Sequence, residues 1–338
     1  MPGAFTTRAG RALPFTAIGF GGASLGVPAS SQSDADGAEL VETAWDLGVR
    51  YYDTAPFYGF GLAERRLGAA LQGSPRGDYV LSTKVGRLLH PDADAWAGAM
   101  DGDPAAWPFD YDYSYDGIMR SFEGSLKRLG LDRVDALYVH DVCGKVHGGR
   151  AASEARIQEL MTTGGWRAVD ELRSSGAVSA IGVGVNEWEP CARMLELADP
   201  DLFLLAGRYT LLEQEPLNAL FPACEKRGVG IVVGGALNAG SLVGGPLYDY
   251  APAPKAIKDR VAAIDAVCRA HGTPIVAAAL KFIAAHPVVK AILTGAANPA
   301  ELRQNVGAFE GPAPPAALWA ELKTERLLHL DAPVPAGA

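Results

Sequence analysis

The sequence contains little cysteine, and its cysteines form no recognisable motif. The four residues Cys143, Cys191, Cys224 and Cys268 are widely spaced, and no two of them make a Cys-x-x-Cys pair. Disulfide frameworks and structural zinc sites show tighter patterns, so we expect four reduced thiols. The first residues, MPGAFTTRAG, also lack the apolar stretch of a secretory signal. Together these absences predict a cytoplasmic protein.

Long hydrophobic runs and an excess of positive charge are absent as well. The most apolar tract, PIVAAALKFIAAHPVVKAILTGAA (274–297), is interrupted by lysines, a histidine and a proline. Its uninterrupted pieces are far shorter than the roughly 20 residues that span a bilayer. The formal net charge of −9 disfavours binding to nucleic acids or anionic membranes. We therefore expect neither kind of partner, and a small molecule as the ligand.

Two common catalytic or cofactor motifs are missing. No His-Glu-x-x-His segment or cluster of acids indicates a catalytic metal, so none is expected. No Gly-x-Gly-x-x-Gly follows a strand and opens a helix, because the segment GFGGASLG has the wrong spacing. Any dinucleotide must therefore be held by something other than a Rossmann fold.

What the sequence does contain is a regular alternation of two patterns. Short runs rich in Val, Ile, Leu and Tyr alternate with helical patterns, which is typical of βαβ units around a parallel sheet. The strand-like runs are 16–22, 49–54, 79–85, 134–140, 180–186, 202–210, 229–235 and 289–294. The helical patterns are near 35–48, 62–72, 116–129, 164–175, 190–198, 216–227, 257–285 and 298–307. Eight such units predict one α/β domain over residues 1–338, a closed (β/α)8 TIM barrel.

Two segments stand outside this alternation. Residues 86–115 form a long connection rich in Asp, Pro, Gly and aromatic residues, which is typical of a lid over an active site. We expect it to cover the substrate, with Trp107 and Tyr113 as substrate-binding residues. After residue 311, a Pro-rich stretch leads into one further helix, which predicts a C-terminal helical tail.

Polar residues close three successive strands of the predicted barrel. Asp53, Lys84 and His140 end the second, third and fourth strands, and Tyr58 follows Asp53 in the next loop. Each has a structural alternative, because an Asp often caps a helix, a Lys pairs with an Asp, and a buried His is often only part of a core. Catalytic residues of such barrels, however, lie at the carboxyl ends of the strands. Four of them at neighbouring ends indicate one site.

These four side chains have a common chemical purpose. A tyrosine with its usual pKa near ~10 is a weak base at neutral pH. Lys84 would stabilise the phenolate of Tyr58, and Asp53 would hold Lys84 through an ion pair. His140 could then orient a substrate oxygen. The set predicts proton transfer at a carbonyl or hydroxyl group.

Three stretches carry a resemblance to a known family. YYDTAPFYGFGLAERRLGAAL, YVLSTKVG and VDALYVHD resemble the aldo-keto reductase superfamily, and the likeness extends from TAIGFGGASLG to ILTGAANPAELRQNV. This resemblance implies a (β/α)8 barrel with a nicotinamide cofactor. It also implies a catalytic tetrad of Asp53, Tyr58, Lys84 and His140, with Tyr58 and His140 contacting the substrate.

The cofactor site follows partly from the residues and partly from the resemblance. Glycine-rich segments at 232–245 and 294–306 could approach a phosphate or simply make turns. The resemblance implies cofactor contacts from Gly22, Ala23, Asp53, Asn186, Gly235, Leu237, Gly295, Ala296, Glu301, Gln304 and Asn305. Two positions depart from the family pattern: Val185 replaces a serine beside Asn186, and Gly234 replaces a tyrosine that stacks on the nicotinamide.

The substrate is narrowed by a closer resemblance. LDRVDALYVHDV, IGVGVNE and LLAGRYTLLEQ look most like the aldose 1-dehydrogenase branch, which oxidises a cyclic hemiacetal such as that of L-fucose, L-galactose or a D-threo-aldose to a lactone. The alternatives are a dehydrogenase of a non-sugar hemiacetal such as pyridoxal, a general NADPH-dependent carbonyl reductase, and a regulatory nucleotide-binding subunit.

The same resemblance bears on the choice between NAD and NADP. Where NADP-using members place a Lys, a Ser and an Arg around the 2′-phosphate, this sequence has Gly295, Ala296 and Glu301. A carboxylate repels phosphate and accepts hydrogen bonds from ribose, which favours NAD. A one-turn shift of the alignment would bring the guanidinium of Arg303 toward the phosphate, which keeps NADP open as the alternative. Glu301 could also simply complement the helix dipole.

Overall fold

Eight parallel strands close into a barrel in the computed structural model, which describes residues 5–26, 31–91, 93 and 107–336. Each strand pairs in parallel with its two neighbours, and the ring runs β10-β11-β14-β3-β4-β5-β8-β9. The strands are β3 (Ile18–Gly21), β4 (Tyr51–Asp53), β5 (Val80–Val85), β8 (Ala136–His140), β9 (Ala180–Val185), β10 (Leu202–Ala206), β11 (Gly230–Gly234) and β14 (Val289–Thr294). All eight predicted strands are present, and the predicted barrel is confirmed.

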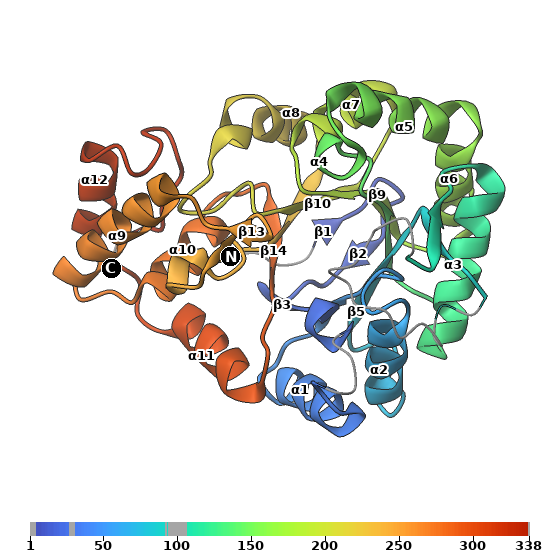
Figure 1. Cartoon of the computed structure of the whole chain (residues 1–338), viewed down its shortest axis with the longest axis horizontal. Coiled ribbons are helices and arrows are strands. Elements are labelled where there is room, and N and C mark those ends of the chain that lie inside the picture. The colour runs from blue at the N-terminus through green and yellow to red at the C-terminus, as the bar shows by residue number, and fades with distance from the viewer. Residues whose placement is uncertain (1–4, 27–30, 92, 94–106, 337–338) are drawn as a thin grey trace.

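The helices surround the ring of strands, as Figure 1 shows. They are α1 (Asp34–Asp46), α2 (Leu62–Leu71), α3 (Tyr115–Leu129), α4 (Gly144–His147), α5 (Arg150–Thr162), α6 (Gly165–Ser175), α7 (Glu189–Leu197), α8 (Leu220–Arg227), α9 (Lys255–Ala270), α10 (Ile275–Ala284), α11 (Pro299–Glu310) and α12 (Ala316–Thr324). α12 packs beside α9 and is the predicted C-terminal tail. None of the helices among the described residues is long and apolar enough to cross a membrane.

The prediction of one helix over 257–285 was wrong. The segment forms α9 and α10, and the chain turns between them at Gly272, where φ is +62°, and at Pro274. A glycine in the left-handed region ends a helix, and the proline after it cannot continue one. Helices α4 and α5, between β8 and α6, were not predicted at all.

Local sequence signals explain where several helices begin and end. Ser33 precedes α1 and exchanges hydrogen bonds with Asp36, so each satisfies a backbone N–H of the other. Ser114 precedes α3, and its hydroxyl accepts a hydrogen bond from the N–H of Gly117. α3 ends at Gly130, in the left-handed conformation that glycine adopts without strain.

The core has two parts. A large cluster lies between the strands and the helices, and a smaller one fills the inside of the barrel. The inner cluster consists of Phe5, Leu13, Phe15, Tyr51, Val80, Ala136, Tyr138, Ala180, Leu202, Leu204, Val232, Ala291 and Leu293. The interior is therefore packed with side chains, as is usual for a barrel of this size.

One end of the barrel is closed by an N-terminal hairpin that was not predicted. Strands β1 (Phe5–Thr6) and β2 (Ala12–Leu13) pair antiparallel and lie within the ring in Figure 1. The ring of Phe15 packs edge-on against Tyr51, the first residue of β4, with 4.6 Å between centroids. The hairpin therefore covers the amino-terminal ends of the strands. The carboxyl-terminal ends, which it does not cover, are called the open rim below.

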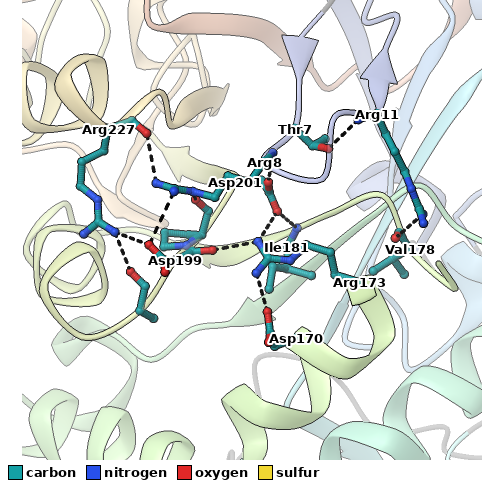
Figure 2. Close-up of polar contacts among 12 residues, drawn as sticks. Thr7, Arg8, Arg11, Asp170, Arg173, Val178, Ile181, Asp199, Asp201 and Arg227 are labelled. Carbon is teal, nitrogen blue, oxygen red and sulfur yellow. Dashed lines mark hydrogen bonds and ion pairs between the residues drawn. The ribbon is translucent and has the colours of Figure 1, made fainter. Parts of the chain in front are cut away.

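Buried and exposed charges fasten this hairpin to the barrel (Figure 2). Asp201, immediately before β10, is fully buried and accepts hydrogen bonds from the backbone N–H groups of Arg8 and Ile181 at 2.7 and 3.1 Å. The guanidinium of Arg173 donates a third, at 2.9 Å. Arg11 reaches the carbonyl of Val178 at 3.1 Å. One carboxylate thus joins the hairpin, α6 and β9.

The two ends of the long connection 86–115 pair with each other and form a second hairpin. β6 (Arg87–Leu89) pairs antiparallel with β7 (Phe109–Tyr111) at the open rim. The tip, residues 92 and 94–106, lies outside the described residues. A third hairpin, β12 (Leu247–Tyr248) with β13 (Ala251–Pro252), follows β11.

Candidate active site

Lys84 is the centre of a buried polar cluster at the open rim. Its ammonium donates hydrogen bonds to Asp53 Oδ2 at 2.6 Å, to the phenol oxygen of Tyr58 at 3.1 Å and to the carbonyl of Thr54 at 2.9 Å. Lys84 and Asp53 are only 1% and 2% exposed. β4 and β5 are neighbours in the ring, so the ends of these strands bring the three predicted side chains together.

A second row of hydroxyl groups supports Asp53 from the barrel interior. Ser82, which pairs with Asp53 across the sheet, donates to its Oδ1 at 2.6 Å. The hydroxyl of Tyr51 lies 3.0 Å from Ser82 Oγ and 3.4 Å from the hydroxyl of Tyr138. Both carboxylate oxygens of Asp53 are therefore occupied, which fixes its orientation toward Lys84.

The protonation of this cluster follows from burial and from its charges. Burial disfavours the ammonium of Lys84, but the carboxylate of Asp53 and the phenol of Tyr58 raise the pKa of Lys84 above its ordinary value. Burial also raises the pKa of Tyr58, and Lys84 opposes that rise without cancelling it. In the free protein, desolvation is therefore the larger effect on the pKa of Tyr58, and the charge of Lys84 opposes it.

His140 faces the same cluster from the end of β8. Its ring meets that of Tyr58 edge-on, with 6.1 Å between centroids, and it also contacts Phe57. Burial lowers the pKa of His140 to about 3. The imidazole is therefore neutral at physiological pH, which leaves it able to form hydrogen bonds but without a positive charge.

The sequence reasoning missed Asp141 and Arg87. Asp141 follows His140 directly, and its carboxylate contacts Arg87 and lies 3.2 Å from Nε2 of His140. Burial opposes its charge, but His140 and Arg87 lower the pKa of Asp141. The sequence contained a signal for Asp141. It is an acid directly after the candidate histidine at the end of β8, just as Asp53 is an acid at the end of β4.

The two aromatic residues predicted to bind substrate have different surroundings. Trp107 packs in an aromatic group with Phe57 and Phe109 at centroid distances of 5.6 and 6.1 Å, next to His140. Tyr113 is fully buried, and its hydroxyl donates to the carbonyl of His140 at 2.8 Å. The prediction for Tyr113 is corrected: it supports the backbone behind the site and has no surface to offer a substrate.

The residues expected to bind the cofactor lie around the same open rim. Gly22 and Ala23 follow β3, Asn186 follows β9, and Gly235 and Leu237 follow β11. Gly295 and Ala296 follow β14, and Glu301, Gln304 and Asn305 lie on α11. β11, β14, β3 and β4 are consecutive in the ring, so the loops that follow them form one arc that ends at Asp53, and β10 separates this arc from β9 and Asn186.

Observations on this arc fit a bound dinucleotide. Three buried polar atoms, Ser24 Oγ, Thr54 Oγ1 and Asn238 Oδ1, have no hydrogen-bond partner within the described chain. Buried polar atoms normally have a hydrogen-bond partner, so these three atoms are available to form hydrogen bonds with a bound ligand. Gly22 comes so close to β4 that a Cβ there would lie 2.7 Å from the carbonyl oxygen of Asp53. Gly295 borders open space instead.

Asn186 lies between this arc and the catalytic cluster. Its Nδ2 is 3.3 Å from Asp141 Oδ1, and its Oδ1 is 3.5 Å from the hydroxyl of Tyr250. The two positions that depart from the family pattern lie at strand ends: Val185 is the last residue of β9, and Gly234, which has no side chain, is the last residue of β11. Tyr250, from the turn of the β12–β13 hairpin, places an aromatic residue next to Asn186.

The amino-terminal end of α11 is closed by its own side chains. Asn298 Oδ1 accepts from the N–H of Glu301 at 3.0 Å, and Glu301 Oε2 accepts from the N–H of Ala297 at 2.8 Å. A carboxylate is therefore fixed at the end of the helix that favours negative charge. Asn305 Nδ2 lies 3.4 Å from the carbonyl of Gly295, and Arg303 is exposed.

In the ranges that the structure covers, no group of three or more metal-ligating side chains occurs.

Comparisons with known proteins agree with this geometry. The Aldo/keto reductase family model matches residues 17–321. The chain is 39% identical to a D-threo-aldose 1-dehydrogenase of a Pseudomonas species, over 95% of this chain and 96% of that protein. It is 40% identical to a pyridoxal 4-dehydrogenase of Microbacterium luteolum, over 94% and 95%. An aldo-keto reductase of Bacillus halodurans in its holo form, 24% identical, has the same fold, with a TM-score of 0.73 over 99% of this chain and 98% of that one.

The strand-end cluster, the closed barrel and these relatives lead to one assignment. The chain belongs to the aldo-keto reductase family and is an NAD(P)-dependent oxidoreductase.

Proposed function

We propose that this protein is an NAD-linked dehydrogenase that oxidises the C1 hemiacetal of an aldose to a lactone. The observation that carries the proposal is the placement of the Lys84 ammonium between Asp53 and Tyr58, with His140 against the phenol. This arrangement suits removal of a proton from a hydroxyl group at neutral pH. The 39% identity to an aldose 1-dehydrogenase supports the choice of a hemiacetal.

Each member of the cluster has a proposed role. Tyr58 takes the proton of the anomeric hydroxyl, Lys84 stabilises the phenolate that is required for this, and Asp53 holds Lys84 in place. His140 orients the anomeric oxygen through a neutral imidazole. A nicotinamide held in this site would supply the acceptor for the hydride of C1, so that hemiacetal and NAD⁺ would give lactone, NADH and one proton.

The proposed cofactor site is the arc described above. Asn186 would hold the carboxamide, and the backbones near Gly22, Ala23, Gly235 and Leu237 would approach the nicotinamide and the pyrophosphate. Gly295, Ala296, Gln304 and Asn305 would surround the adenosine. Glu301, fixed at the end of α11, would repel a 2′-phosphate and accept hydrogen bonds from a free ribose hydroxyl. This supports NAD over NADP.

A second candidate function is the oxidation of pyridoxal, as its cyclic hemiacetal, to 4-pyridoxolactone. The 40% identity to a pyridoxal 4-dehydrogenase supports it equally well by sequence. The aromatic group beside His140, made by Phe57, Trp107 and Phe109, is a surface on which a planar ring can pack. An aldose presents hydroxyl groups and needs more polar partners than this wall provides.

The experiment is a substrate panel read by the absorbance of the reduced cofactor. L-fucose, L-galactose, D-threo-aldoses and pyridoxal are each incubated with NAD⁺ and with NADP⁺. The proposal expects the highest kcat/KM for an aldose with NAD⁺, and preference for pyridoxal would replace it with the second candidate. Turnover only of simple carbonyl compounds with NADPH would contradict both.

Trp107 is the residue that separates the two candidates further. We expect Trp107→Ala to raise KM for the preferred substrate or to change substrate preference, since the indole lies in the wall beside His140. Equal loss toward every substrate together with a lower melting temperature would instead assign Trp107 to packing of the hairpin. Trp45→Ala serves as the matched control, because Trp45 packs against Arg50 and Tyr79, directly before β4 and β5 at the opposite end of the barrel.

A further inference from the structure

Asp141 touches two residues to which the proposed function gives separate tasks. The residue is buried, with 3% of its surface exposed, and Oδ2 lies 3.2 Å from Nε2 of His140. Its Oδ1 lies 3.3 Å from the amide nitrogen of Asn186. One buried carboxylate therefore joins the residue that would meet the substrate oxygen and the residue that would meet the carboxamide.

The backbone of Asp141 is held in an uncommon conformation. Its φ is +57°, the left-handed region that residues other than glycine seldom adopt. The hydroxyl of Tyr113 lies 3.2 Å and Nε2 of His147 lies 2.8 Å from its carbonyl oxygen. Strained residues persist only where the surroundings enforce them, and they gather at functional sites. The surroundings of Asp141 enforce this position from both its backbone and its side chain.

The negative charge of Asp141 is stabilised by the guanidinium of Arg87. The ion pair with Arg87 is buried on both sides, with side chains 5% exposed. The guanidinium also stacks on Phe57 at 3.7 Å from the ring centroid, and its remaining nitrogens, Nε and Nη1, have no hydrogen-bond partner among the described residues. Arg87 therefore stabilises the ionised form of Asp141, and the Asp141 carboxylate keeps its charge beside His140.

We propose that Asp141 is a positioning residue that holds neutral His140 as the tautomer with its proton on Nε2, and orients the Asn186 amide so that its nitrogen faces Asp141. An ionised carboxylate only accepts hydrogen bonds. A nitrogen lone pair on Nε2 or an amide oxygen would be repelled at these distances, whereas an N–H is attracted. Asn186 Oδ1 then faces away from Asp141, on the side of Tyr250.

As a consequence, the charge of Asp141 determines which atoms of His140 and of Asn186 donate hydrogen bonds and which accept them. Nε2 of His140 becomes a donor, and Nδ1, which is buried and has no partner in the described structure, is left as the acceptor. This inference rests on the proposed function for the tasks of His140 and Asn186, but the tautomer itself requires no substrate.

The direct test is nitrogen NMR of the protein labelled with ¹⁵N-histidine. The chain has six histidines, and His140→Gln identifies the signals of His140 by their disappearance. We expect neutral His140 with the proton on Nε2, without titration between about pH 6 and 8. A proton on Nδ1 in the wild type would overturn the proposal, whatever any variant does.

Asp141→Asn provides the functional test. Asn tolerates the left-handed region, so the substitution adds no backbone strain, and its amide can donate as well as accept. We expect His140 to populate the other tautomer and kcat on the best substrate of the panel to fall roughly ten- to a thousandfold, since the wrong tautomer disables catalytic histidines elsewhere. A lower kcat with an unchanged tautomer, or a changed tautomer with wild-type kcat, would refute the assigned role.

A matched control lies far from the site. Glu321 accepts from His271 at 2.7 Å on the surface, so Glu321→Gln makes the same acid-to-amide change beside a histidine. It is expected to leave kcat and the His140 tautomer unchanged. If no aldose or pyridoxal is oxidised, the proposed function fails while the tautomer measurement still decides the role of Asp141.

Discussion

The ammonium of Lys84 lies 3.1 Å from the phenol oxygen of Tyr58, and the Lys84 side chain is almost completely buried. The same ammonium is tied to Asp53 at 2.6 Å, so its position is fixed from the opposite side. A cation in this place lowers the cost of forming a phenolate in a buried environment. The reactivity of Tyr58 is therefore governed by Lys84.

Tyr58→Phe tests the proton transfer directly. Removing only the hydroxyl should reduce kcat by roughly 10²–10⁴-fold, the usual contribution of general acid–base catalysis. Binding of the reduced cofactor, followed by fluorescence, should remain near that of the wild type, since the ring stays in place. A variant with nearly wild-type turnover would show that Tyr58 is not the proton acceptor.

The pH dependence of oxidation follows from the raised pKa of Tyr58. Oxidation needs the phenolate, so kcat should increase with pH and level off above the pKa that applies in the enzyme complex. Lys84→Met removes the charge that lowers this pKa, so the pKa should rise and the profile should move to higher pH. Measuring kcat from about pH 6 to 10 for both proteins checks the sign. A shift toward lower pH in Lys84→Met would contradict it.

Cofactor choice is tested by Glu301→Arg. The wild type should prefer NAD⁺ over NADP⁺ by more than about tenfold in kcat/KM, which corresponds to a difference of ~1.4 kcal/mol or more. The variant should narrow the gap because a guanidinium replaces the carboxylate at the start of α11. Arg303→Ala is the control for the alternative contact, and a wild-type preference for NADP⁺ together with its loss in Arg303→Ala would assign the phosphate to Arg303.

Asp201→Asn tests the closed end of the barrel. Losing the charge leaves Arg173 without its buried partner and should lower the free energy of unfolding by about 2–4 kcal/mol. Asp199→Asn changes a neighbouring acid whose side chain is 63% exposed and should cost less than about 1 kcal/mol. Urea denaturation compares them. Both variants should retain kcat, because neither residue lies at the open rim.

The sequence was informative where a residue's position in the alternation determines its surroundings. Asp53, Lys84 and His140 close neighbouring strands, so predicting the barrel brought them together before any distance was known. Tyr58 needed only the short path from Asp53. The identity of each partner in this cluster then followed from charge.

It was less informative where contacts depend on the path of loops. Arg87 reaches Asp141 from a hairpin whose route over the rim leaves no trace in apolar periodicity. Tyr113 resembles its aromatic neighbours in composition, yet the chain turns it into the core. Helix α5 was overlooked because it buries only Ser153, Ile157 and Leu160, too few for a clear apolar stripe.

The hairpin at the amino-terminal end of the strands has a practical consequence for handling this protein. Phe5 is anchored among the inner core residues, opposite the rim that carries Lys84 and Tyr58. A solid support or an electrode linked through the amino-terminal side of Phe5 would therefore leave the rim facing the solution. Immobilised biosensors made in this orientation would keep diffusion of small molecules to the site unobstructed.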